Sequence, residues 1–153
     1  EEAEVDLNEC ISDSIDIIGH QLEIKNIKVE KEIKPDIPKI WGNKREIEQI
    51  FLNLFINASH AIGEKGGVIK VETQIENEFI IAKIKDTGCG ISKENIDKIF
   101  DPFFTTKEVG EGTGLGLSII YELVEKLGGK IEVKSKVGVG TEFILSFPAY
   151  RKN

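Results

Sequence analysis

Residues 86–117 read DTGCGISKENIDKIFDPFFTTKEVGEGTGLGL, and the rest of the chain is organised around this stretch. It begins with a carboxylate and two glycines, Asp86, Gly88 and Gly90. An aromatic cluster follows, and then alternating glycines lead into an apolar helical pattern. Because a helix N-terminus offers unpaired N–H groups and a positive dipole end, glycines before it let phosphate oxygens approach the backbone. The stretch therefore favours phosphate binding.

Two common phosphate-binding fingerprints do not fit this stretch. A P-loop closes its glycine run with Gly-Lys-Ser or Gly-Lys-Thr, whereas these glycines lead into Leu115 and Leu117. The dinucleotide fingerprint needs a different glycine spacing directly after a strand. Taken alone, the glycine run is equally compatible with a flexible connection.

Composition limits the classes of protein and partner. The chain has 153 residues, 40% apolar and 31% charged, which predicts one globular domain over residues 1–153. A net charge of −7 provides no basic stripe for nucleic acid or an anionic membrane. Two cysteines make no disulfide framework, and no apolar run reaches the roughly 18–20 residues of a membrane span. We expect a cytoplasmic location. The lack of methionine indicates a fragment of a longer protein.

Apolar periodicity predicts the order of helices and strands. Helices are expected over 5–22, with Asp6 or Asn8 near the cap, over 43–62 and 115–127, and briefly over 92–99. Strands are expected over 27–33, 68–75, 79–85, 130–136 and 141–147. Such blocks predict an α+β two-layer sandwich, with one mixed, mostly antiparallel sheet covered by helices on one face. The glycine-rich segment 100–113 is too long for a simple turn and predicts a mobile functional loop.

Polar side chains stand beside the expected core in two places. Along the helix over 43–62, which Asn43 and Glu46 open as a capping-box variant, the residues Glu46, Asn53, Asn57 and His60 share one edge of the apolar arc. Asp86 ends an inward-facing row of the strand over 79–85, so its carboxylate needs a donor there.

With these motifs assembled, the chain resembles the ATP-binding domain of sensor histidine kinases, in the GHKL superfamily with DNA gyrase B and MutL. Five motifs carry the resemblance in family order: NLFINASHA (53–61), DTGCGI (86–91), FDPFFTTK (100–107), GEGTGLGLSI (110–119) and GVGTEF (138–143). The resemblance implies the Bergerat ATP-binding fold.

The resemblance also implies roles for single residues. Asp86 would accept the adenine amino group, and Thr141 would assist through a water. Asn57 would bind Mg²⁺, with Asn53 as a second ligand or water holder, since Mg²⁺ prefers oxygen ligands and keeps several waters. Segment 100–113 would be a lid over ATP. The implied ATP-binding set is Asn53, Asn57, His60, Asp86, Gly88, Gly90, Ile91, Thr106, Lys107, Gly112, Thr113, Gly114, Leu115, Gly116, Leu117 and Thr141.

Two positions depart from the family pattern. His60 stands where many of these kinases carry lysine or arginine, and it is either a phosphate donor or a half-buried helix residue. A family kinase phosphorylates a histidine, usually followed by an acidic residue, on a separate helical hairpin, but His20 precedes Gln21. The resemblance therefore implies an upstream phosphoacceptor hairpin, a downstream response regulator receiver domain, a homodimeric intact protein and a monomeric fragment.

Other functions of the same fold stay open. An ATPase of the gyrase or MutL kind would use a glutamate at the position of Asn53 as general base, and an amide cannot take a proton. Anti-sigma serine kinases also tend to carry that glutamate. A nucleotide-sensing module without transfer activity is the third alternative.

Overall fold

The computed structural model describes residues 1–102 and 114–151, with the backbone alone at 114 and 115. Its elements are β1 (Glu2–Val5), α1 (Leu7–Ile24), β2 (Ile27–Glu32), β3 (Ile40–Asn43), α2 (Lys44–Ile62), the 3-10 turn η1 (Gly63–Lys65), β4 (Gly67–Glu76), β5 (Phe79–Asp86), α3 (Lys93–Ile96), α4 (Gly114–Lys126), β6 (Lys130–Lys136) and β7 (Gly140–Pro148).

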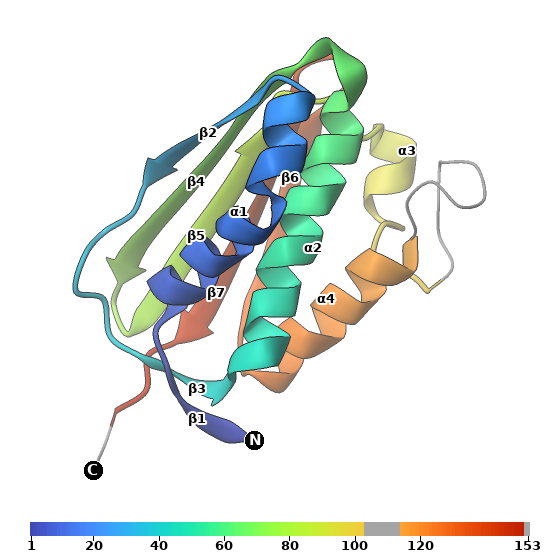
Figure 1. Cartoon of the computed structure of the whole chain (residues 1–153). Helices are drawn as coiled ribbons and strands as arrows, with labels where there is room; N and C mark the ends of the chain where they lie inside the picture. The colour runs from blue at the N-terminus through green and yellow to red at the C-terminus, as the bar shows by residue number, and fades with distance from the viewer. Residues whose placement is uncertain (103–113, 152–153) are drawn as a thin grey trace.

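The fold is a two-layer α+β sandwich. Its main sheet has the strand order β2-β4-β5-β7-β6, in which β2 and β4 are parallel and every other pair is antiparallel. Helices α1, α2 and α4 lie across one face of this sheet (Figure 1). The expected layers and mixed sheet are therefore confirmed.

A second, two-stranded sheet was not expected. β1 and β3 pair antiparallel, with Val5 opposite Ile40. Both side chains are buried, because this small sheet closes the end of the core where the helices α1 and α2 begin. The prediction that Val5 belongs to the first helix is wrong: Asp6 caps α1, and its Oδ1 accepts the Glu9 N–H at 3.3 Å. Strands of four residues are too short to show alternation.

The other helix ends follow local chemistry. Asn43 Oδ1 accepts the Glu46 N–H at 3.1 Å and caps α2, as expected. The Glu46 carboxylate accepts from Lys126 Nζ at 3.1 Å, so it links α2 to α4. α3 is shorter than predicted and ends at Ile96, because the chain then turns to bury Ile99.

The core lies between α2 and the central strands. Ile80, Ala82 and Ile84 of β5 form the expected inward row, and each is almost fully buried. α4 faces the core with Ile120 and Val124. Ile119, predicted to point inward, is 42% exposed, because the buried face of α4 is the one that carries Ile120 and Val124. The inward row of β5 continues directly into Asp86.

Candidate nucleotide-binding site

Asp86 is a buried carboxylate at the end of β5, with only 4% of its surface exposed. Its Oδ1 accepts the Gly88 N–H at 2.8 Å. Burial raises the pKa of Asp86, and the backbone N–H groups of Gly88 and Thr141 oppose that rise. These donors fix the carboxylate, and its four lone-pair sites leave room for another donor. The donor that the sequence required for Asp86 is thus partly supplied by the protein backbone.

Helix α2 carries the next polar group. Asn53, Asn57 and His60 follow one another at helical spacings of four and three, so they share one face. Both asparagines are half-buried and His60 is exposed. The Asn57 Nδ2 atom is buried and has no hydrogen-bond partner within residues 1–102 and 114–151. A buried amide without a partner is costly, so this one is open to a ligand.

The loop after β5 docks against α2. Cys89 N–H donates to the Ala61 carbonyl at 3.0 Å, one helical turn beyond Asn57. A Cβ on Gly88 would lie 2.7 Å from the Ala61 carbonyl carbon, so this contact requires glycine. The loop thereby brings the Asp86 end of β5 against the same end of α2 that carries Asn57.

The other side of the loop docks against the β6–β7 turn. Gly90 has a φ of +80°, and a Cβ there would lie 2.3 Å from the Lys136 carbonyl oxygen. Gly138 N–H donates to the Cys89 carbonyl at 2.8 Å. Both glycines of the first glycine motif are therefore explained by contacts within the protein. Their approach to a purine stays a prediction.

Three residues that hold the surroundings of Asp86 are absent from the predicted ATP-binding set: Ser135, Gly140 and Ala61. Ser135 of β6 bonds Ile91, Gly140 and Thr141, and Thr141 pairs in register with Asp86. A Cβ on Gly140 would lie 2.0 Å from the Asp86 carbonyl oxygen. On the helix side, the Ala61 carbonyl accepts the hydrogen bond from the Cys89 N–H. Ser135 was detectable, because a period of two places it on the inward face after Ile131 and Val133.

The remaining predicted residues belong to the glycine-rich segment and α4. Residues Gly114, Leu115, Gly116 and Leu117 form the first turn of α4, which packs beside α2 (Figure 1). Thr106, Lys107, Gly112 and Thr113 lie outside the described residues, as does most of the expected lid. Phe100, which precedes them, packs on Tyr121 and Phe143 with ring centroids 5.3 and 6.4 Å apart.

The described part of the chain offers no competing metal cluster. Residues 1–102 and 114–151 contain no group of three or more His, Cys, Asp or Glu side chains that could hold a metal ion. That Asn57 and Asn53 bind Mg²⁺ stays a prediction. No helix among the described residues has the length and apolarity needed to cross a membrane.

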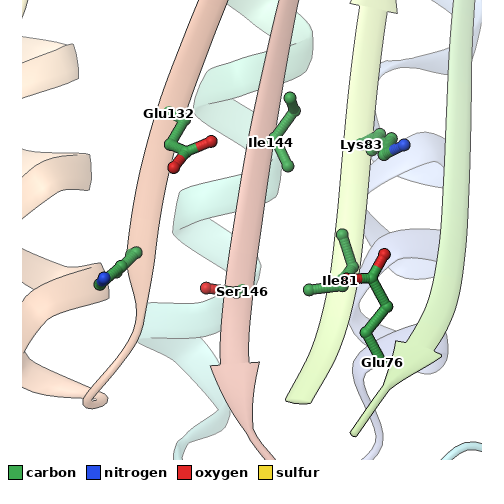
Figure 2. A pocket seen from close by; sticks show the side chains of 7 residues that line it. Glu76, Ile81, Lys83, Glu132, Ile144 and Ser146 are labelled. Carbon is green, nitrogen blue, oxygen red and sulfur yellow. The ribbon is translucent and has the colours of Figure 1, made fainter.

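A hollow on the opposite face of the sheet is a poor alternative site. Its lining residues belong to β4, β5, β6 and β7, and Figure 2 shows the helices behind the sheet. Ile81 and Ile144 lie among residues of both charges, including Glu76, Lys83 and Glu132. Such alternation of charge is typical of a solvated sheet face.

Comparison with known proteins identifies the fold family. Residues 42–151 match the family described as histidine kinase-, DNA gyrase B-, and HSP90-like ATPase. The chain belongs to this family. The match spans every motif of the predicted resemblance, from Asn53 to Phe143. The ATP-binding fold that the resemblance implied is confirmed at this level.

Individual members of the family are sensor kinases. Sensor histidine kinase ZraS of Escherichia coli K12 is 37% identical over 144 residues, which are 94% of this chain and 30% of that protein. Sporulation kinase E of Bacillus subtilis 168 is 30% identical, over 93% of this chain and 19% of its own length. The nucleotide-free catalytic domain of histidine kinase ThkA matches with a TM-score of 0.86 and 33% identity, covering 97% of this chain and 96% of that one. The chain spans less than a third of the curated relatives.

Proposed function

We propose that this chain binds Mg·ATP and presents its γ-phosphate to a histidine on a separate helical-hairpin domain of a two-component signalling kinase. One observation carries the proposal. The Cys89–Ala61 hydrogen bond holds the loop after the buried Asp86 against the end of α2, where Asn57 Nδ2 has no hydrogen-bond partner among the described residues. A carboxylate acceptor for a base and an amide group for a metal thus occur on neighbouring segments.

The residues fit the adenine end of ATP. Asp86 is held by backbone donors, so it keeps its position whether or not a ligand is bound. A fixed carboxylate accepts strongly from an exocyclic amino group, because hydrogen bonds to charged groups are the stronger kind. Thr141 adds a hydroxyl beside it.

The residues also fit Mg²⁺. Turning the Asn57 side-chain amide by half a turn exchanges its nitrogen and oxygen ends, so the unpaired buried end can present oxygen. Mg²⁺ takes one or two protein oxygens and completes its shell with water and phosphate. Asn53 stands one turn earlier on the same face.

The chain's own groups position the nucleotide without attacking it. Mg·ATP, when bound, supplies the γ-phosphoryl group together with a metal charge near it. Asp86 and Thr141 orient the base, and Asn57 and Asn53 orient the metal. Neither amide of α2 can accept a proton from water, so hydrolysis by general-base catalysis is disfavoured at Asn53. These properties suit transfer of the γ-phosphoryl group to another domain.

The acceptor and the partners belong to the intact protein. His20 is exposed on α1 and precedes Gln21, which does not match the acceptor pattern. We place the acceptor histidine on an upstream hairpin that dimerises, with a response regulator receiver domain downstream. The intact protein then acts as a homodimer, whereas this chain is a monomer in the cytoplasm.

Label transfer from γ-labelled ATP tests the proposal. The chain is incubated with Mg²⁺ and a helical hairpin that carries a histidine followed by an acidic residue. With ATP below saturation, we expect acid-labile label on the hairpin with the unaltered chain, less label with Asp86→Asn, and none with the hairpin alone. Steady release of free phosphate without labelled hairpin would identify an ATPase and contradict the proposal.

A further inference from the structure

The inward row of β6 ends on a serine that connects three parts of the site. Ser135 Oγ accepts the Ile91 N–H at 2.7 Å. The same oxygen lies 2.9 Å from the Gly140 carbonyl oxygen and 2.8 Å from Thr141 Oγ1. One hydroxyl therefore bonds the loop after Asp86, the start of β7 and the threonine that pairs with Asp86.

The number of protons available determines which group donates in each hydrogen bond of this cluster. A serine hydroxyl has one proton and two acceptor positions. Ile91 N–H can only donate and the Gly140 carbonyl can only accept, so all three contacts are satisfied when the Ser135 proton goes to Gly140. The Ser135–Thr141 bond then uses the threonine proton. The opposite direction would leave the Ser135 and Gly140 oxygens 2.9 Å apart without a proton between them, which is unfavourable because two oxygen lone pairs then face each other.

This direction decides what Thr141 offers to a further partner. Once its proton is given to Ser135, the Thr141 oxygen has only lone pairs left. Thr141 is 5% exposed and pairs in register with Asp86, which is itself an acceptor. Two acceptors therefore stand side by side where β5 ends and β7 begins.

We propose that Ser135 is a positioning residue that holds the Thr141 hydroxyl as an acceptor, and so favours a purine with an amino group at position 6 over one with a carbonyl there. The inference rests on the proposed nucleotide site and names the group that sets its base selectivity. A 6-carbonyl would meet two acceptors, directly or through a water. A Thr141 hydroxyl released from Ser135 could turn and donate to that carbonyl.

Competition binding of ATP and ITP, which differ at position 6, tests the inference. Ser135→Ala should lower the ATP-over-ITP preference by about 3- to 10-fold, the effect of one neutral hydrogen bond. Ser135→Thr keeps the hydroxyl and should restore the preference. Ser146→Ala is the matched control, because Ser146 lies on the neighbouring strand and on the opposite face of the sheet (Figure 2). It should leave the preference unchanged.

A double-mutant cycle separates positioning from general structural damage. In a Thr141→Val background, Ser135→Ala should cause no further loss of preference, because its effect passes through the threonine hydroxyl. Thr141→Val alone should lower the preference by the same factor, and it carries the test if Ser135→Ala does not fold. Without nucleotide, amide exchange at Ile91 should be faster in Ser135→Ala than in Ser146→Ala.

The outcomes distinguish the two proposals. An unchanged ATP-over-ITP preference in Ser135→Ala, with the unaltered chain binding ATP, would overturn the role of Ser135 alone. A further loss in the Thr141→Val background would overturn it as well. Failure of the unaltered chain to bind either nucleotide would overturn the proposed function together with this inference.

Discussion

At the scale of single residues, burial of the Asp86 carboxylate lowers the free energy of unfolding at neutral pH. Burial raises its pKa above the ordinary 3.8, so the folded chain holds the proton more tightly than the unfolded chain. The cost of burying the charge is therefore absent at low pH and appears as pH rises through the raised pKa. We expect Asp86→Asn to increase the free energy of unfolding of the nucleotide-free chain at pH 7, with no gain below about pH 3.8. Urea unfolding at several pH values measures this.

The same substitution should weaken nucleotide binding. Replacing the charged acceptor costs roughly 1.5–3 kcal/mol, about 10- to 150-fold in ATP affinity. Affinity of the unaltered chain should also fall as pH is lowered through the raised pKa of Asp86, because a protonated carboxyl is a weaker acceptor. Unchanged ATP affinity in Asp86→Asn would remove Asp86 as the base-binding residue.

Asn57 allows a sharper separation of binding from stability. Its Nδ2 is buried and makes no hydrogen bond to the described residues, so Asn57→Ala should not lower the free energy of unfolding. Loss of a metal-supporting group typically costs about 10- to 100-fold in affinity, so Mg·ATP binding should fall far more than adenosine binding. Asn43→Ala is the control: it removes the α2 cap, costs about 1 kcal/mol of stability, and spares the metal dependence. Equal losses for Mg·ATP and adenosine would make Asn57 structural.

At the scale of elements, the loop after β5 depends on glycine where it meets α2. A Cβ on Gly88 would lie 2.7 Å from the Ala61 carbonyl carbon and Cβ, and backbone atoms give way poorly. Gly88→Ala should therefore cost about 1–3 kcal/mol of stability and weaken ATP binding. Gly19→Ala in α1 meets nothing within 4 Å and should stabilise the chain by about 0.5–1 kcal/mol. Denaturant unfolding compares them, and equal stability of the two variants would refute the close contact.

Long periodic elements were predictable and short ones were not. The helix over 43–62 and the strand over 130–136 appear almost as expected, because their patterns span several turns or alternations. β1 and β3 have four residues each, and their apolar residues fit a helix as well as a strand. The prediction for Ile119 failed because periodicity indicates an apolar arc but not how much of that arc the neighbouring elements cover.

At the scale of the whole molecule, the site depends on contacts between distant segments. Asp86 was predictable, because alternation along β5 alone places it inward. Ser135 bonds Ile91, 44 residues away, so its role depends on how the strands are ordered. The docking of Cys89 on Ala61 likewise joins a loop to a helix. Local patterns therefore predict the chemistry of the site, and tertiary structure supplies the residues that hold it together.

The two thiols differ in burial, so their labelling rates test the packing of the folded chain. Cys10 lies on the buried face of α1 within the core, and burial raises its pKa to about 12. Cys89 is exposed in the loop after β5. Because the thiolate is the reactive form, a thiol reagent at pH 8 should label Cys89 alone in the folded chain and both cysteines in denaturant. Cys89→Ser should abolish labelling of the folded chain. Labelling of Cys10 at a similar rate would contradict the packing of α1.

The central claim is that the ends of β5 and α2 form one Mg·ATP site. Calorimetric titration with a non-hydrolysable ATP analogue, in Mg²⁺ and again in a chelator, tests it most directly. We predict one binding site per chain, tighter binding in Mg²⁺ than in chelator, loss of that difference in Asn57→Ala, and weakened binding in both conditions in Asp86→Asn. No binding by the unaltered chain, or binding that neither variant alters, would contradict the account.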